Sequence, residues 1–549
     1  MKKARSERIK KLTLDLVRIQ SDTGTRQEKD VENYLHAWLG KLDYFKSHPD
    51  CFGQYPLEQD PLGRCVVWGL AKGQGDQTVI LMHHHDVVDA FDYGKLEKWA
   101  YDPVDLESAL KDVELSPEVG RDLASGRWLF GRGTGDMKGG GAIQLTLLEE
   151  YAARLEFKGN ILLLSVPDEE SLSVGMRGSL SLLTELKETF KLNYKILINS
   201  EPHAKTQDKD GTFQIGSAGK LLPIVHVRGK KTHIGHIYQG LNPVLLLSEI
   251  VLQTELNTDY SDLNRGELSP PPAWSFMRDR KEVYDASIPL YAGGYLSLIS
   301  LKKSPGELLA QLKATCENAF RQVIDRIKES HAAYCRKKND REPLFPWKVN
   351  VKTFEELYRQ ALEDSGEDFK KAYSKQLESI AAEISLQRLN SPEATFRIIE
   401  TTLGYVDDLS PMVVIALSPP YYPAIHNDEF PMLPESVRNL TDHLVRFAAN
   451  RWQESYSITN YMMGLTDCSY AALQNSENIV PVIGPNMPLW QRTYDIPFAE
   501  MKALSLPIIN LGPWGKDHHK FTERVYKPDL YERTPALLEC AIEYLLREE

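Results

Sequence analysis

The sequence has little of what membrane insertion, disulfide crosslinking or nucleic-acid binding requires. No apolar run approaches the ~18 residues of a transmembrane helix, and one of the longest, VLLLSEIVL, contains Glu249. Six cysteines are spread over 549 residues without a CxxC pair, which favours reduced thiols. The net charge is −12, and no basic patch with interleaved aromatic residues is present. We therefore expect a cytoplasmic protein that binds neither nucleic acid nor a membrane.

Three further signatures are absent. The N-terminal MKKARSERIKKLTLDLVRIQ lacks the continuous apolar region of a signal peptide and predicts an amphipathic helix instead. The glycine-rich stretch GRGTGDMKGGG has GxGxG rather than GxGxxG spacing, and Asp136 within it would repel a pyrophosphate. No G-x-S-x-G nucleophile elbow occurs. These absences argue against an NAD-dependent enzyme and a serine hydrolase.

The first 200 residues alternate short apolar runs with helical patterns. TVILM, NILLLSV and YKILIN have strand length and are apolar throughout, as in a sheet that is covered on both faces. A helical pattern, AIQLTLLEEYAARLEF, follows the glycine-rich stretch. This alternation predicts an α/β fold with a mostly parallel sheet and helices on both faces.

The pattern changes near residue 212. LLPIVHVRG and GGYLSLISL predict strands, NPVLLLSEIVLQTEL predicts a helix, and Ser304 and Glu307 form the capping box of a long helix. This order suits an α+β domain with helices on one face of its sheet, and FPWKVNV (345–351) is a candidate last strand. After a charged helical stretch, SPMVVIALSPP and LPIINLG predict buried strands again. We expect three segments: a first part of a catalytic α/β domain at 1–212, an inserted α+β domain at 213–353, and a second catalytic part at 354–549 that includes a helical insertion at 354–404.

Acids and histidines follow the predicted strands. They are His84 and Asp86 after VILM, Asp168, Glu169 and Glu170 after ILLLSVP, Glu201 after YKILINS, His518 and His519 after LPIINLGPWGKD, and Asp136 in the glycine-rich turn. Singly, each has an ordinary explanation, because a histidine at a strand end is usually structural and a DEE run is usually a solvated loop. Ligands of open α/β sheets bind outside the carboxyl ends of the strands, however, and these segments end at one such edge.

Mixed imidazole and carboxylate ligands suit divalent metal ions. Two histidines and three acids suffice for two ions about 3.5–4 Å apart that share one carboxylate. Residues two apart in an extended segment face the same way, so Asp86 can orient His84. The flanking His83 and His85 are expected to point elsewhere.

These motifs together resemble the M20 family of metallopeptidases and deacylases. HHD, GRGTGDMKGG, PDEE, NSEP and HHKFTERV carry the resemblance, which spans most of the chain. The length and the helical stretch before SPMVVIAL are similar to the arginine utilization protein RocB branch of that family. The resemblance implies a zinc-exopeptidase-like α/β fold with an inserted, ferredoxin-like α+β lid domain. It is also compatible with a homodimer formed through that lid.

The resemblance implies a ligand set for two metal ions: His84 and Glu201 for one, Glu170 and His519 for the other, and Asp136 as the bridge. It also implies that Glu169 is the general base and that Asp86 orients His84. His519 is preferred to His518 because it lies four residues before Glu523, which is the family's H-x-x-x-E spacing. A cis peptide bond between Asp136 and Met137 is a further implication.

In the predicted lid, His233 falls four residues after Gly229, where the family places an oxyanion-binding histidine that the partner subunit often supplies. An exposed histidine without a catalytic role is the alternative. Asn242 lies in the family's G-x-N-P position, which implies a role in placing the substrate.

The stretch GLTDCSY departs from the family pattern. Asp467 is present, but Ser469 and Tyr470 stand where the family has an arginine that binds a substrate carboxylate. This change leaves the metal ligands intact and affects the expectation for substrate recognition.

The sequence therefore predicts a hydrolase that uses two divalent ions, zinc first with cobalt or manganese as alternatives, to cleave an amide bond of a small substrate. An N-acyl amino acid or a short peptide in arginine catabolism fits the resemblance. The alternative is a binding or regulatory protein of the same fold that retains metal but has no activity. A degraded enzyme commonly loses a ligand or the base, and here all expected positions are filled.

Overall fold

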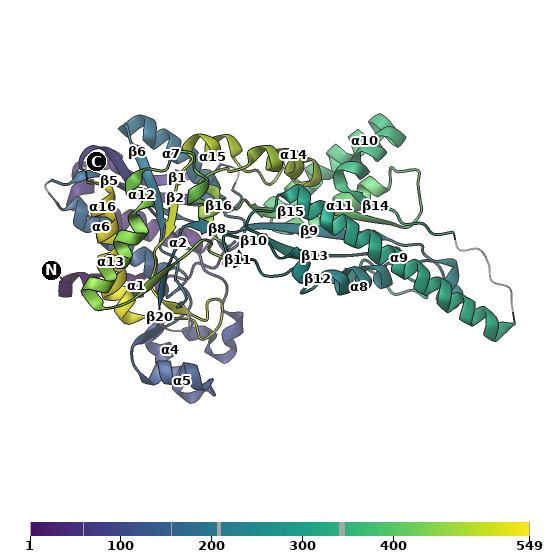
Figure 1. Ribbon diagram of the computed structural model, residues 1–549, viewed down its shortest axis with the longest axis horizontal. Helices are drawn as coiled ribbons and strands as arrows, with labels where there is room; N and C mark the ends of the chain where they lie inside the picture. Colours follow the sequence, from purple (N-terminus) through teal and green to yellow (C-terminus); the bar gives the residue numbers. More distant parts are fainter. Residues whose placement is uncertain (1, 59, 155, 206–209, 340–345, 548–549) are drawn as a thin grey trace. The chain divides into compact units, whose positions relative to one another are not determined.

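The computed structural model describes residues 2–547 except 59, 155, 206–209 and 340–345 (Figure 1). The chain forms two compact units. The first comprises Met1–Ser217, Ile425–Gln474 and Pro497–Glu549, and the second comprises Ala218–Ala424 and Asn475–Ile496. Among the helices formed by the described residues, none combines the length and the apolar character that crossing a membrane would require.

The first unit contains an eight-stranded sheet in the order β1-β2-β5-β3-β6-β18-β7-β17. The central strands β5, β3, β6 and β18 are parallel, whereas β1 and β2 add antiparallel pairs at one edge. The strands are β1 (Phe52–Pro56), β2 (Cys65–Lys72), β3 (Gln74–His84), β5 (Lys158–Val166), β6 (Asn193–Asn199), β7 (Gly211–Gln214), β17 (Tyr456–Thr459) and β18 (Ile508–Asn510). The three apolar runs predicted as buried strands are β3, β5 and β6, which lie side by side.

Helices cover both faces of this sheet, as predicted. Successive residues Val79, Ile80 and Leu81 of β3 point to opposite faces, yet each is fully buried. The helices that contact the central strands are α6 (Lys138–Ala152) and α7 (Val174–Phe190), and α1 (Lys2–Arg18) and α16 (Thr534–Leu545) pack on α6. The centre of the sheet is therefore mostly apolar, and the acids and histidines that follow the strands need a physical explanation.

The second unit contains a five-stranded sheet in the order β12-β13-β9-β15-β14. Its strands are β9 (Gly219–Arg228), β12 (Ala273–Asp279), β13 (Tyr291–Ser300), β14 (Val351–Thr353) and β15 (Met412–Tyr422). The strand predicted at 345–351 overlaps β14 only at Val351, because residues 346–350 form no strand and residue 345 lies outside the described residues.

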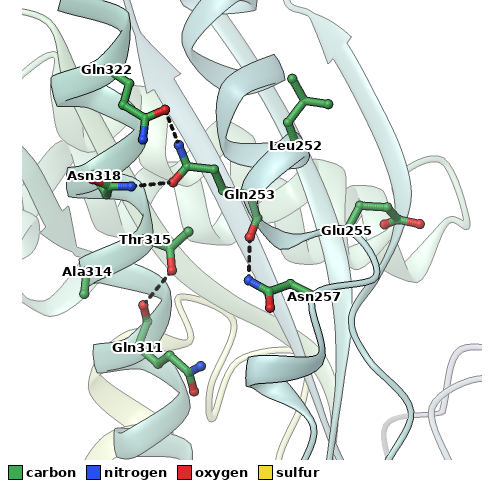
Figure 2. Close-up of a pocket in the computed structure, with 9 residues that line it drawn as sticks. All are labelled: Leu252, Gln253, Glu255, Asn257, Gln311, Ala314, Thr315, Asn318 and Gln322. Carbon is green, nitrogen blue, oxygen red and sulfur yellow. Dashed lines mark hydrogen bonds between the residues drawn. The ribbon is translucent and has the colours of Figure 1, made fainter.

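Two helices on one face of this sheet are joined by side-chain amides. They are α8 (Pro243–Thr254) and α9 (Pro305–Lys338). Gln253 of α8 donates to Gln322 at 3.1 Å and accepts from Asn318 at 3.0 Å, both on α9 (Figure 2). The capping box of Ser304 and Glu307 at the start of α9 is present, which confirms that prediction.

The second unit extends further along the chain than the sequence indicated. The sequence predicts that residues 354–549 belong to the catalytic domain, but residues 354–424 and 475–496 lie in the second unit, where β15 pairs with β9. The helices α10 (Phe354–Ser385) and α11 (Ser391–Leu403) share a core with Ile224 and Val414 of that sheet. Val225 and Val413 point to the other face and are also buried, so helices cover both faces instead of one. The apolar pattern predicts a buried strand correctly, but it does not say which sheet the strand joins.

Candidate metal centre

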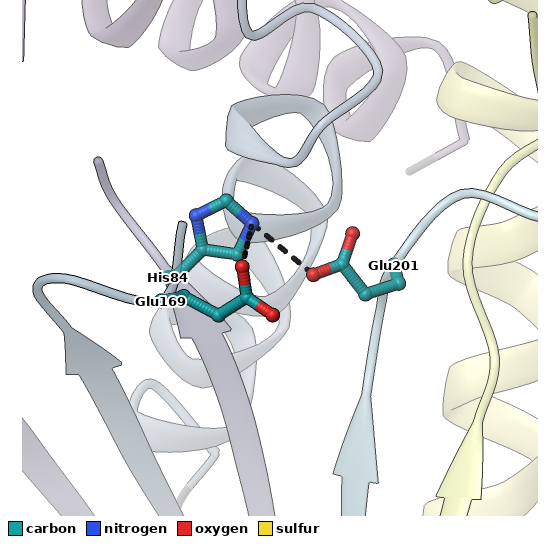
Figure 3. Close-up of side chains that lie close together, drawn as sticks. All are labelled: His84, Glu169 and Glu201. Carbon is teal, nitrogen blue, oxygen red and sulfur yellow. Dashed lines mark ion pairs between the residues drawn. The ribbon is translucent and has the colours of Figure 1, made fainter. Parts of the chain in front are cut away.

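His84 lies at the carboxyl end of β3, where the strand leaves the apolar core. Its imidazole is 1% exposed, and its Nε2 is 3.0 Å from Asp136 Oδ1 and 3.1 Å from Glu201 Oε1. Glu201 follows the adjacent strand β6. Figure 3 shows Glu201 and Glu169 directed toward the same ring, with Glu169 Oε2 at 4.0 Å from Nε2. Neighbouring strands therefore bring one imidazole and several carboxylates together, as the sequence predicted.

His519 forms a second, matching arrangement. Its Nε2 is 3.2 Å from Asp136 Oδ2 and 3.1 Å from Glu170 Oε2, and half of its side chain is exposed. The two oxygens of Asp136 thus face two different imidazoles, those of His84 and His519. His518 lies beside Gly135 instead, and its Nε2 has no hydrogen-bond partner among the described residues.

Glu523 holds the loop that carries Asp136. Its Oε1 accepts the backbone N–H groups of Gly135 and Asp136 at 3.1 and 3.2 Å, and its Oε2 accepts from Arg132 at 2.9 Å. The Asp136–Met137 peptide bond is cis, as the resemblance implied. In the sequence analysis, Glu523 served only to choose between His518 and His519. No sequence pattern indicated its ion pair with Arg132, which is 391 residues away.

Asp86 connects the loop that follows β3 with the loop that carries Glu169 and Glu170. One of its carboxylate oxygens is 3.5 Å from His84 Nδ1, and the Asp86 carbonyl lies 3.0 Å from the same nitrogen. Its two carboxylate oxygens also accept the N–H groups of Glu169 and Glu170, at 3.1 and 3.2 Å. Asp86 therefore fixes the ring of His84 and, in addition, the backbone of the two glutamates, a role that the sequence did not indicate.

The flanking histidines point away from this set. His83 Nδ1 is 3.0 Å from Gln144 Oε1, and burial lowers the pKa of His83 to about 3. His85 Nδ1 is 3.0 Å from the hydroxyl of Ser165. Alternation along the strand thus separates His84 from its two neighbours, in line with the sequence prediction.

The positive charge near Glu169, Glu170 and Glu201 is too small to keep their pKa values at the ordinary level. Burial, together with the charge of Asp136, raises the pKa of Glu201 to about 8 and that of Glu170 to about 7, although the imidazoles act in the opposite direction. Burial also raises the pKa of Glu169 well above its ordinary value. Hydrogen bonds to Asp136 and Glu170 raise the pKa of His519 to about 10. Bound cations would stabilise the ionised carboxylates, and these nitrogen and oxygen donors suit divalent ions.

Two of the remaining predicted residues, His233 and Asn242, belong to the second unit. His233 is exposed, and its Nδ1 accepts the N–H of Gly235 at 3.1 Å. Asn242 caps α8 by accepting the N–H of Val244 at 3.0 Å. This capping contact gives Asn242 a structural role that the sequence analysis did not consider.

Asp467 belongs to the first unit and is 1% exposed. Its charge contributes to the raised pKa of Glu169, and burial raises its own pKa to about 7. Ser469 forms a hydroxyl–hydroxyl hydrogen bond of 2.8 Å with Ser217, and Tyr470 is fully buried. The positions where an arginine was expected are therefore part of the core.

Known proteins are similar to this chain in sequence or in fold. Residues 80–491 match the description "Peptidase family M20/M25/M40". YqjN of Bacillus subtilis is 35% identical over 545 residues, which cover 98% of this chain and 96% of YqjN. Protein RocB of the same bacterium is 30% identical over 552 residues, with 99% and 95% covered. A solved tripeptidase from Staphylococcus aureus has a TM-score of 0.54 at 14% identity, with 99% of both chains covered, and shares the fold.

Proposed function

The chain belongs to peptidase family M20/M25/M40 and is a hydrolase of this metallopeptidase family, and we propose that it uses two divalent ions to cleave an amide bond in a small substrate. The observation that carries the proposal is the position of Asp136. Its two carboxylate oxygens face the imidazoles of His84 and His519, and each imidazole has a further carboxylate beside it. A shared carboxylate between two ligand sets is the arrangement of a two-ion site.

In this proposal the ligands divide into two sets. His84 and Glu201 would hold one ion, Glu170 and His519 would hold the other, and Asp136 would serve as a ligand to both. Zinc suits these nitrogen and oxygen donors best, and cobalt and manganese are alternatives. When bound, such ions polarise an amide carbonyl and make water more acidic.

Glu169 is the proposed general base. Its carboxylate is directed toward the metal-binding set and is not needed as a ligand, so it can take a proton from water and deliver one to the departing amine. Burial raises its pKa well above the ordinary value of a glutamate, which makes the ionised carboxylate a stronger proton acceptor than a glutamate in water. Asp86 positions His84 and the Glu169 backbone. In the second unit, His233 is the proposed donor to the developing oxyanion.

The finer proposal concerns the substrate. We propose an N-acyl amino acid or a short peptide, with arginine catabolism as the setting because RocB is similar over nearly its whole length. Asn242 and Asp467 are the proposed substrate-binding residues. A buried carboxylate at 467, without the arginine that the family pattern has nearby, favours a substrate whose contact at this point is a donor or a cation over one that presents a carboxylate.

A protein that retains metal without catalysis is the alternative. The experiment that separates the two uses protein with its metal content measured, incubated with a panel of N-acyl amino acids and dipeptides, with the products identified by mass spectrometry. We expect about two ions per chain and hydrolysis of at least one class. Two bound ions with no hydrolysis of any amide would favour the binding protein, and a protein that binds no divalent ion would contradict the proposal altogether.

A further inference from the structure

A second group of buried charged residues lies next to the loop that carries Glu169 and Glu170. The proposed reaction does not use these residues. Glu28 begins α2 (Glu28–Leu39), Arg64 directly precedes β2, and Asp168 directly precedes Glu169. Their exposed fractions are 0%, 5% and 3%. Charged groups that leave water are costly unless they are paired and hydrogen-bonded, so a buried group of this kind calls for a physical explanation.

Arg64 joins three carboxylates that come from separate parts of the chain. Its Nη1 donates to Glu28 Oε1 at 2.8 Å and to Asp168 Oδ1 at 2.7 Å. Its Nη2 donates to Asp60 Oδ1 at 2.8 Å. The planar guanidinium makes these contacts simultaneously because its donors point in fixed, divergent directions, which the single ammonium of a lysine cannot reproduce.

Glu28 holds the backbone of the loop that carries the two catalytic-site glutamates. Its Oε2 accepts the N–H of Asp168 at 2.9 Å, and Asp168 has a φ of +69°, where residues other than glycine are uncommon. The next two N–H groups, of Glu169 and Glu170, donate to Asp86. Three successive backbone N–H groups are thus held by two buried carboxylates.

The segment that leads to Glu28 also lies along the loop that follows His84. The Val87 N–H donates to the Ser21 carbonyl at 3.0 Å, and the Thr23 N–H donates to the Val87 carbonyl at 2.8 Å. The Ser21 hydroxyl donates to the His85 carbonyl at 2.7 Å. One short stretch near the N-terminus therefore supports two loops that both bring residues to the metal centre.

We infer that Glu28 and Arg64 are positioning residues for the proposed reaction: they fix the backbone of residues 168–170 and thereby the places of Glu169 and Glu170. The inference rests on the proposed function. Neither residue needs to touch a metal ion or the substrate, because a displacement of about 1 Å in a catalytic group is enough to lower a rate by about 100-fold.

The test compares Arg64→Lys with Arg5→Lys. Arg5 also bonds two carboxylates, Glu150 and Glu539, which lie on α6 and α16. Glu150 is near the end of α6, 14 residues beyond Asp136 in the sequence. The control therefore removes a guanidinium that bonds two carboxylates away from the metal centre. We expect both variants to melt at a lower temperature than the wild type.

Of these two variants, only Arg64→Lys should change the turnover and the zinc affinity. We expect its kcat to fall by about 10- to 100-fold while KM changes by less than about threefold. In a chelator competition, its zinc affinity should fall by about 10- to 100-fold, as for residues that orient metal ligands. Glu28→Gln, which keeps the side-chain volume, should act in the same direction and provides the test if Arg64→Lys does not fold.

Several outcomes would overturn the inference. One is a folded Arg64→Lys or Glu28→Gln protein with the kcat and zinc affinity of the Arg5→Lys control. Another is fast hydrogen exchange at the amides of residues 168–170 in the wild-type protein, which needs no variant. A wild-type protein that binds no metal would instead contradict the proposed function, so the two failures are distinguishable.

Discussion

Each of the two units contains a cluster of acids that are partly or fully removed from solvent, and the clusters differ in how their charge is balanced. In the second unit, Arg280 donates to Glu393 at 2.8 Å and to Glu400 at 2.5 Å, and His226 Nε2 is 3.2 Å from Glu400. Burial acts to raise the pKa of Glu400, but the hydrogen bonds from His226 and Arg280 outweigh it, so the pKa lies below the ordinary value.

In the first unit, Glu201 and Glu170 pair with imidazoles, and their pKa values remain raised, at about 8 and about 7. The comparison separates two uses of buried charge. The acids of the second cluster are balanced by Arg280 and need no further cation, whereas the raised pKa values of Glu170 and Glu201 fit acids that hold the divalent ions proposed above.

The largest effect should come from Glu169→Gln. We expect kcat to fall by about 10²- to 10⁴-fold, because an amide cannot act as the general base, while both ions remain bound. The measurements are turnover and metal content per chain. Glu400→Gln is the matched control from the other cluster, and it should leave kcat unchanged. A Glu169→Gln enzyme with wild-type turnover would remove Glu169 from the mechanism.

The pH dependence of stability should differ with and without metal. A carboxyl whose folded-state pKa is raised holds its proton more tightly in the folded protein, so the free energy of unfolding falls as pH rises from the ordinary value of 4.5 through about 7 for Glu170 and about 8 for Glu201. The melting temperature of the metal-free protein should therefore fall across this window. Zinc should restore it most strongly at the alkaline end, where protons compete least.

Differential scanning fluorimetry from about pH 5 to about pH 8, with a chelator or with excess zinc, checks this expectation. We expect zinc to have no comparable effect on stability through the cluster of Arg280, because that arginine already balances its acids. A melting temperature that rises with pH in the metal-free protein, or that does not respond to zinc at the alkaline end, would mean that the two clusters do not differ as described.

The sequence contained most of what places the metal centre. The apolar runs at β3, β5 and β6 were recognisable because each strand is buried on both faces, and the ligands follow directly where those strands end. The association of His84 with Asp136, 52 residues away, came from the resemblance to the M20 family, because Asp136 lies in a glycine-rich turn and follows no predicted strand. The strand signals depend on local chain geometry, whereas the bridging role of Asp136 does not.

Other features depend on long-range packing and left no local mark. Nothing in the stretch around Arg64 shows that it meets Glu28 and Asp168, 36 and 104 residues away. Residues 412–422 read as a buried strand in either unit, and the choice depends on which sheet edge is open, here that of β9. Apolar periodicity reports burial, but partner choice belongs to the tertiary structure.

A smaller effect should follow from Arg280→Met, which removes the balancing charge of the second cluster. Glu393 and Glu400 would lose their guanidinium partner, and we expect the free energy of unfolding to fall by about 1–3 kcal/mol. Urea unfolding measures this change, while kcat and zinc affinity serve as the readouts that should not move. A loss of turnover that exceeds the loss of folded protein would show that this cluster also serves the reaction.

The smallest expected effect concerns the capping box of α9. Ser304→Ala removes the hydroxyl that accepts the Glu307 N–H at 3.3 Å, and such a change costs about 0.5–2 kcal/mol of stability. Urea unfolding should show the loss, and Ser304→Thr, which keeps the hydroxyl, should recover most of it. Zinc affinity should stay constant in both variants, because the cap belongs to the second unit and the ligands belong to the first. If Ser304→Ala weakened zinc binding, the stability of the second unit would have to act on the metal centre, and the two clusters could no longer be treated as separate.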